Sequence, residues 1–211
     1  MNLIHISDLT PDDIQAIWKL ARTSPQTMNG CVGWSFEGNG IRTRTSFIQA
    51  FLELGLSYIE LPNLLKSAER ACDLAGYLDP FYTLYVIRES NHQRLMDFAA
   101  ASTRPVINAM SQEGHPCEVL TDACYLESTL GPIEKLRIGL WGPTTNVFKS
   151  WHELAAALDF EISHFCPADF HTSKHKVVYR ETPDHPVDVL ITDSWPAGFA
   201  TADWALTNDH L

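Results

Sequence analysis

Hydrophobic and polar residues are arranged along the chain in a pattern that predicts short strands separated by helices. The segment Cys31–Phe36 alternates as a short buried strand does. After a turn that contains glycine, Phe47, Ile48, Phe51 and Leu52 recur at the spacing of one helix face. The same pattern predicts further strands over 56–61, 81–87, 105–109, 136–141, 160–165 and 187–192, and further helices ending near residues 21, 78, 101, 129 and 158.

Alternation of strands and helices predicts an α/β protein with parallel sheets and right-handed crossovers. Gly131-Pro132 interrupts the pattern, which then restarts with an apolar strand. We therefore expect two lobes, 1–131 and 132–211, each a doubly wound parallel sheet flanked by helices.

Composition narrows the class of protein. The chain has 211 residues, of which 45% are hydrophobic, so a packed core is expected. A net charge of -11 argues against a broad basic surface for nucleic acid. No apolar run approaches the ~20 residues of a membrane span. Five cysteines without a Cys-x-x-Cys pair favour reduced thiols in a cytoplasmic protein and give no sign of a structural zinc site.

The turn after the first strand contains the clearest candidate chemistry. Gly40-Ile41-Arg42-Thr43-Arg44 places two arginines where a strand gives way to a helix. Backbone N–H groups at a helix start attract anions, and guanidinium groups match phosphate or carboxylate. The alternative interpretation is an ordinary helix N-terminus with solvated arginines.

Polar residues follow several other predicted strands. Arg42, Arg88, His115, Asn146 and Asp193 all come after strand ends. Ligands of parallel sheets bind at the carboxyl ends of the strands, so this coincidence favours a binding site. Asp193 has a second interpretation as a helix cap, and Asn146 as a turn residue.

Two weaker patterns concern metal binding and nicotinamide binding. His171 and His175 are four residues apart, a spacing suited to metal on a helix, but the flanking residues favour a solvated loop. The loop 142–146 lacks the Gly-x-Gly-x-x-Gly pattern, so nicotinamide binding is disfavoured.

In their order, these motifs resemble the aspartate/ornithine carbamoyltransferase family, and the ornithine branch more closely. Its Ser-Thr-Arg-Thr-Arg motif is matched by residues 40–44, its strand-end arginine by Arg88 and its His-Pro-x-Gln motif by residues 115–118. Asn146 stands at the place of a substrate-binding asparagine, and residues 192–195 are similar to the family's Thr-Asp-x-Trp. The resemblance covers roughly residues 1 to 200. In the family, His-Pro-Cys occurs without a nucleophilic cysteine, so Cys117 is expected to have no such role.

The resemblance implies a reaction and a set of site residues. Carbamoyl phosphate would place its phosphate on Arg42 and Thr43, with Arg88 reaching from the next strand and His115 donating to the carbamoyl oxygen. No metal or organic cofactor is needed. Relatives form trimers, so a homo-oligomer is expected. The substrate-binding positions implied in addition are Gly40, Ile41, Arg44, Glu118, Asn146 and Asp193.

Departures from the family concern the donor and the acceptor. Gly40 and Ile41 replace a serine and a threonine, and each lost hydroxyl weakens phosphate binding by roughly 1 kcal/mol. Glu118 replaces a glutamine. Ala197-Gly198 stands in place of a Ser-Met pair, and the His-Cys-Leu-Pro motif and last helix have no counterpart before Leu211. We therefore expect a truncated second lobe and an acceptor other than ornithine.

Three functions are compatible with these motifs. The first is a carbamoyltransferase that acts on an amine of a small metabolite. The second is a non-catalytic relative that binds an anion or assembles with other subunits. The third is a transferase or lyase with an altered donor, in which Glu118 acts as an acid or base.

Overall fold

The computed structural model describes residues 1–196, 198–199 and 204–206. The chain divides into two compact units, Met1–Glu118 and Val119–Leu211. Each unit contains a four-stranded sheet in which all pairings are parallel, so the expected α/β fold is confirmed. The division falls inside helix α5 (Pro116–Leu130), whose far end adjoins the predicted boundary at Gly131. That boundary stays a prediction.

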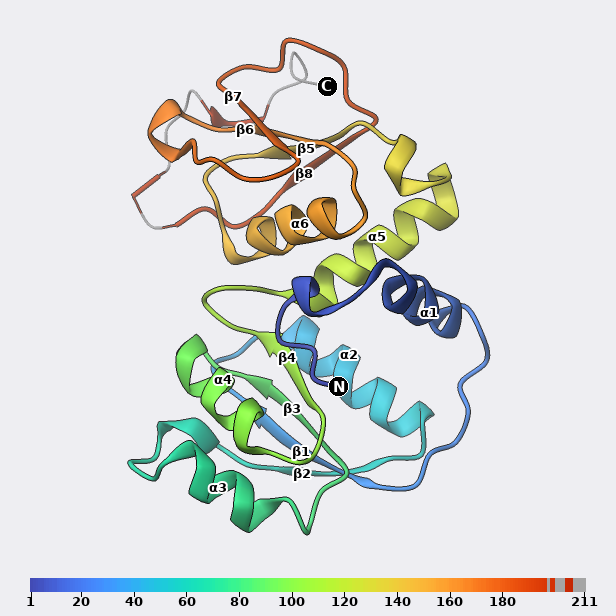
Figure 1. The fold of residues 1–211 in the computed structure, drawn as a ribbon, viewed down its shortest axis with the longest axis vertical. Helices are drawn as coiled ribbons and strands as arrows, with labels where there is room; N and C mark the ends of the chain where they lie inside the picture. Colours follow the sequence, from blue (N-terminus) through green and yellow to red (C-terminus); the bar gives the residue numbers. More distant parts are fainter. Residues whose placement is uncertain (197, 200–203, 207–211) are drawn as a thin grey trace. The chain divides into compact units, whose positions relative to one another are not determined.

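The first unit is built on a sheet with strand order β2-β1-β3-β4. Its strands are β1 (Cys31–Phe36), β2 (Ser57–Glu60), β3 (Leu84–Arg88) and β4 (Val106–Met110). The chain moves one way from β1 to β2 and the other way from β2 to β3. Right-handed crossovers therefore place helices on both faces. Figure 1 shows α2 (Ile41–Glu53) on one side of the sheet and α3 (Ala71–Leu78) and α4 (His92–Ala101) on the other.

Each face of this sheet has its own apolar core. On the side of α3 and α4, the ring of Tyr85 meets that of Phe98 edge-on with centroids 5.0 Å apart, and both are fully buried. On the side of α2, Trp34 packs against Phe51 and Phe36. The two cores hold β1 and β3 rigidly between them, and these are the strands whose ends carry the candidate site.

The sheet of the second unit has strand order β7-β6-β5-β8. Its strands are β5 (Ile138–Trp141), β6 (Ile162–Phe165), β7 (Val177–Arg180) and β8 (Val189–Thr192). Helix α6 (Asn146–Ala157) lies along this sheet and buries Phe148, Trp151 and Leu154 completely (Figure 1).

The remaining elements are short or peripheral. Helix α1 (Pro11–Ala21) begins with a capping box between Thr10 and Asp13. Four single-turn 3-10 helices complete the described part: η1 (Ile6–Asp8), η2 (Leu64–Lys66), η3 (Ile133–Lys135) and η4 (Ala168–Phe170). Within the residues described, no helix is long and apolar enough to cross a membrane.

Apart from β1, the predicted strands begin one to three residues later in the structure, and one strand was not predicted. The third strand begins at Leu84 rather than at residue 81, because the N–H of Phe81 closes a turn on the carbonyl of Leu78 at the end of α3. Strand β7 was not predicted at all. It has only four residues, lies at the sheet edge and is half-buried throughout, so it lacks the alternation that identifies a strand.

Candidate anion site and its surroundings

The first unit gathers polar residues at one edge of its sheet. The three strands β1, β3 and β4 are parallel neighbours, so the segments that follow them emerge at the same edge. These segments carry the arginine turn of residues 40–44, Arg88 and the loop that leads to His115. Three of the segments that the sequence singled out therefore leave the same edge of one sheet.

The start of α2 presents backbone N–H groups at this edge. Gly40 is the N-cap residue, and no side chain caps the helix. The first intrahelical bond runs from the N–H of Arg44 to the carbonyl of Gly40, 2.9 Å. The N–H groups of residues 41–43 precede that bond and thus have no acceptor within the helix. Ile41 and Arg42 are exposed and Thr43 is half-buried, so an anion can approach these groups.

Arg44 is held in a different environment. Its Nη2 donates to Glu60 Oε1 at 2.7 Å, and its guanidinium lies 5.1 Å from the centroid of the Phe36 ring. The hydrogen bond to Glu60 raises the pKa of Arg44. This arrangement ties α2 to the edge strand β2. A substrate contact of Arg44 stays a prediction that would require this ion pair to open.

Arg88 ends β3 directly beside Phe36, the last residue of β1. The guanidinium carbon lies 5.0 Å from the centroid of the Phe36 ring, close enough for a cation–π contact. Burial lowers the pKa of Arg88, while the charges of Glu37 and Glu118 act in the opposite direction. An arginine stays protonated after such a shift. Arg88 thus offers a fixed positive charge at the sheet edge.

A network of two carboxylates and a lysine, one of the carboxylates buried, supports the loop after Arg88 and was not suggested by the sequence. Lys66 Nζ lies 2.6 Å from Glu89 Oε1 and 3.1 Å from Glu37 Oε1. Glu89 is only 3% exposed and also accepts from the N–H of Asn91. Glu37 accepts from the N–H of Ser90 at 2.6 Å. The signal was present in the chain, since Glu37 and Glu89 directly follow β1 and β3, but their common partner Lys66 is distant in sequence.

His115 and Glu118 form an ion-pair geometry at the start of α5. His115 Nε2 lies 3.0 Å from Glu118 Oε2, and the histidine is buried while the carboxylate is 44% exposed. Between them, Cys117 donates weakly to the carbonyl of Asn108. Burial raises the pKa of Cys117 to about 12, so its thiol is protonated at neutral pH. The pairing makes Glu118 the immediate neighbour of the histidine that the resemblance implicates.

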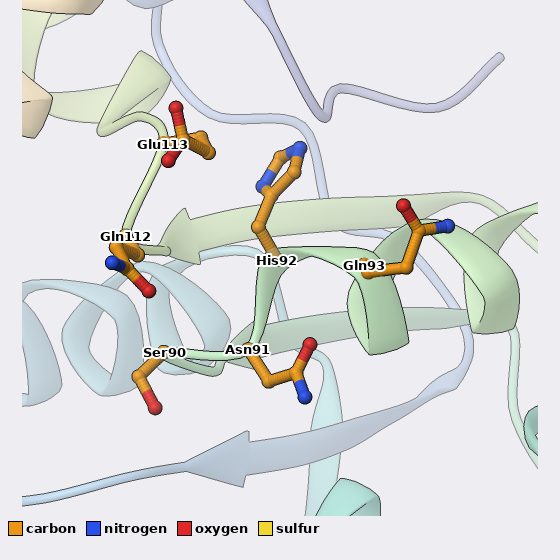
Figure 2. Close-up of a pocket in the computed structure, with 6 residues that line it drawn as sticks. All are labelled: Ser90, Asn91, His92, Gln93, Gln112 and Glu113. Carbon is orange, nitrogen blue, oxygen red and sulfur yellow. The ribbon is translucent and has the colours of Figure 1, made fainter.

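A polar cavity of about 500 Å³ lies between the loops that follow β3 and β4. Figure 2 shows Ser90, Asn91, His92 and Gln93 on one side of it and Gln112 and Glu113 on the loop after β4. Much of its lining is already engaged within the protein. Asn91 caps α4 and Gln93 donates to Asp97, while His92 bonds Ser111 and His5. The cavity therefore adjoins the anion site without defining a ligand of its own.

The second unit holds the other two predicted positions. Asn146 is the first residue of α6, and its Oδ1 accepts from the N–H of Val147 at 3.0 Å. Asp193 follows β8, and its Oδ1 accepts from the N–H of Ser194 at 2.7 Å. These bonds join neighbours in sequence, and the substrate-binding roles of Asn146 and Asp193 stay predictions. Strands β5 and β8 are adjacent, so both residues leave the same sheet edge.

Trp195 completes this part of the second unit. Its indole packs on the backbone of Gly142, where a Cβ would lie 3.0 Å from Trp195 Cδ1. Gly142 has a φ of +116°, a conformation that favours glycine. Ala197, at which the acceptor motif departs from the family, lies outside the described residues.

His171 and His175 do not form a metal site in the described part of the chain. His171 Nε2 bonds the carbonyl of Cys166, and His175 is exposed in the loop before β7. Among the residues described, no three histidine, cysteine, aspartate or glutamate side chains are grouped so that they could hold a metal ion.

The first unit thus carries two arginines, a histidine and the N–H groups of a helix start on segments that leave one edge of a parallel sheet. Residues 1–128 match the family described as aspartate/ornithine carbamoyltransferase, carbamoyl-P binding domain. The chain belongs to this family.

Individual relatives agree with this assignment. Over 176 residues, the chain is 32% identical to the ornithine carbamoyltransferase of Caulobacter vibrioides, an alignment that covers 76% of this chain and 57% of that enzyme. It is 29% identical to the ornithine carbamoyltransferase of Syntrophus aciditrophicus over 92% of this chain and 73% of that enzyme. The crystal structure of the ornithine carbamoyltransferase from Burkholderia thailandensis superposes with a TM-score of 0.89 at 22% identity, over 99% of this chain and 80% of that one. The chain thus spans little more than half the length of the first of these relatives.

Proposed function

We propose that the protein transfers a carbamoyl group from carbamoyl phosphate to an amine of a small metabolite other than ornithine. In this reaction the uncharged amine nitrogen forms a bond to the carbonyl carbon. The bond from that carbon to the phosphate oxygen breaks, and phosphate leaves with the electron pair while the nitrogen gives up a proton. The observation that carries the proposal is the grouping of Arg42, Thr43, Arg88 and His115 at one sheet edge of a domain of the carbamoyltransferase family.

The start of α2 is assigned to the phosphate of the donor. Three backbone N–H groups precede the first intrahelical bond, and the exposed side chain of Arg42 adjoins them. Helix N-termini and guanidinium groups both favour a dianion at this position. The missing hydroxyls of Gly40 and Ile41 leave the backbone donors, Arg42 and Arg88 to supply most of the binding energy.

His115, Arg88 and Thr43 are assigned to the carbamoyl oxygen. Charge develops on this oxygen as the amine attacks, and preorganised donors stabilise it. His115 Nε2 lies 3.0 Å from Glu118 Oε2, so donation by His115 to the carbamoyl oxygen requires that Glu118 turns away or that both ring nitrogens carry a proton. The Glu118 carboxylate is able to accept from the carbamoyl NH2 group, the task of the glutamine that it replaces. Positioning of donor and acceptor supplies much of the remaining rate.

The acceptor is assigned to the second unit, through Asp193 for a cationic group and Asn146 for a polar one. Both residues follow neighbouring strands and share one sheet edge. Their altered surroundings in the sequence support an acceptor that differs from ornithine.

We further propose that the protein is a cytoplasmic homo-oligomer, with a trimer as the expected form. Strand β2 supports this assignment because it is a sheet edge whose four residues are all exposed, including Tyr58 and Ile59. Exposed edges with apolar side chains are typical of subunit contacts. Sedimentation equilibrium of the purified chain measures the assembly state, and a monomer at all concentrations would contradict this part of the proposal.

Calorimetric titration with carbamoyl phosphate tests the donor assignment. Arg42→Ala removes a charged hydrogen bond and is expected to weaken binding roughly ten- to hundredfold. Arg70→Gln is the matched control, because Arg70 is exposed and pairs with Asp73 on α3, outside the site. If the parent protein shows no saturable binding, or if Arg42→Ala binds as the parent does, the donor assignment is wrong.

Phosphate release separates transfer from binding alone. The protein is mixed with carbamoyl phosphate and a panel of amines, and release that depends on one amine supports transfer. Binding without release under every amine would favour a non-catalytic relative. The proximity of Glu118 to His115 favours one alternative reaction, in which Glu118 acts as acid or base on another donor. Activity that requires Glu118 and is indifferent to carbamoyl phosphate would identify that reaction.

A further inference from the structure

Arg88 is confined between two features of β1 and the turn that follows it. On one side lies the Phe36 ring, whose centroid is 5.0 Å from the guanidinium carbon. On the other lies the backbone of Gly40. A Cβ built on Gly40 would overlap Arg88 Nη1 and would lie 2.8 Å from Arg88 Cζ and 3.0 Å from Phe36 Cζ. The guanidinium therefore occupies the space that any side chain at position 40 would need.

The backbone itself does not require glycine at this position. Gly40 has a φ of -50°, which every residue can adopt, unlike the positive φ of Gly38 and Gly55. Gly40 is also the N-cap residue of α2, where serine, threonine, asparagine and aspartate are preferred because they cap the first N–H groups. Local helix chemistry thus favours a side chain at position 40, and the Arg88 guanidinium, with the edge of the Phe36 ring behind it, opposes one.

We propose that Gly40 is a positioning residue for Arg88: its missing side chain leaves the slot against Phe36 that holds the guanidinium beside the N-terminus of α2. The inference rests on the proposed function, because the positioned Arg88 guanidinium would bind the phosphate of carbamoyl phosphate. Arg88 then holds a charged donor in the space that a side chain at position 40 would need. The ligand class that fits this donor is a dianionic phosphoryl group, since hydrogen bonds between a guanidinium and a phosphate are strengthened by the charges of both partners.

Gly40→Ala is the direct test, with calorimetric binding of inorganic phosphate and of carbamoyl phosphate as the first readout. The two nearest atoms in the way belong to the end of the flexible Arg88 side chain and the third, Phe36 Cζ, lies at 3.0 Å, so the fold can accept the methyl group by displacing Arg88 and shifting the ring slightly. We expect phosphate binding to weaken about tenfold, while the thermal midpoint stays near that of the parent. Gly76→Ala is the matched control, because a Cβ at Gly76 in α3 meets no atom within 4 Å.

A double variant identifies the route of the effect. If Gly40 acts through Arg88, adding Gly40→Ala to Arg88→Ala produces no further loss of phosphate affinity. An equal loss in the presence and absence of Arg88 overturns the inference, as does a Gly40→Ala protein that binds phosphate as tightly as the parent. Gly40→Ser gives a second check, because its hydroxyl can cap α2 and yet is expected to weaken binding through the same displacement.

A chemical readout keeps the inference testable even if the proposed function fails. Phenylglyoxal modifies accessible guanidinium groups, and the modification of Arg88 is followed by peptide mass spectrometry. We expect Arg88 to react several times faster in Gly40→Ala than in the parent or in Gly76→Ala, with Arg70 as an internal standard. An unchanged rate at Arg88 overturns the inference. Faster modification in a protein that does not bind carbamoyl phosphate supports the positioning role and refutes only the proposed function.

Discussion

The pH dependence of stability is predicted by two buried histidines in the second unit. His152 Nε2 lies 3.1 Å from His164 Nδ1, and His164 Nε2 lies 2.8 Å from the carbonyl of Gly142. The carbonyl can only accept, so His164 Nε2 carries a proton, and His164 Nδ1 is left to accept from His152. The chain of bonds is complete when both rings are neutral. A second proton on His164 would place two N–H groups against each other.

Burial lowers the pKa of His152 to about 3, with the neighbouring His164 and Lys174 charges acting in the same direction. Burial also lowers the pKa of His164 to about 4, helped by His171 and opposed by the bond to Gly142. Histidine in the unfolded chain titrates near 6.5, so between that pH and about 4 the unfolded state binds more protons than the folded state. Stability is therefore complete above pH 6.5 and is lost as the pH falls. Between pH 7 and pH 5 each histidine lowers the free energy of unfolding by about 2 kcal/mol. In this range the buried rings stay neutral, so the loss is set by protonation of the histidines in the unfolded chain.

Urea unfolding at pH 7, 6 and 5 measures this loss. We expect the two histidines together to lower the free energy of unfolding by roughly 4 kcal/mol between pH 7 and pH 5. His152→Gln is expected to reduce this pH dependence by about half. His175→Gln is the control, because His175 is exposed and its removal should leave the slope unchanged. Titration of the histidine ring protons by NMR gives an independent check. A His152 or His164 resonance that titrates between pH 5.5 and 7 would refute the reasoning, as would equal slopes for the parent and His152→Gln.

Two other substitutions test single interactions. Asp79 accepts from Thr103, Ser102 and Tyr85; burial opposes its ionisation, but these bonds outweigh burial and lower its pKa. Asp79→Asn turns an acceptor into a donor that faces these donors, so we expect a loss of about 2–4 kcal/mol in unfolding free energy, measured against exposed Asp12→Asn. Glu118→Gln removes a negative charge near the proposed phosphate site and is expected to tighten carbamoyl phosphate binding severalfold in calorimetry, whereas Glu113→Gln, on the exposed loop, should change it little. Weaker binding by Glu118→Gln would count against the proposed donor.

Local sequence patterns were sufficient for most of the elements. The strand Cys31–Phe36 was predicted with its observed limits, and the predicted helix end near residue 101 matches the end of α4 at Ala101. In both segments the apolar residues recur with a clear period and the element ends at a recognisable residue. Both signals are set by residues close in sequence, so they can be seen without the tertiary structure. Strand β7 escaped prediction because four half-buried residues at a sheet edge carry no such period.

The partners of the candidate site residues were not predictable in the same way. Arg44 is paired with Glu60 across the sheet edge, and Lys66 joins Glu37 to Glu89. The close approach of Arg88 to Gly40 links residues from two different strand ends. Such contacts depend on which strands become neighbours, and many strand orders are compatible with one pattern of alternation.

The sequence by itself determined the alternation of strands and helices, the family and the set of residues that follow the strand ends. Its motifs are local, and local spacing is enough to place a residue at the end of a strand. Only the tertiary structure decided which of these residues meet. The order β2-β1-β3-β4 puts Phe36 beside Arg88, and the bare backbone of Gly40 then leaves room for the guanidinium. That proximity arises from non-local packing, which no spacing along the chain records.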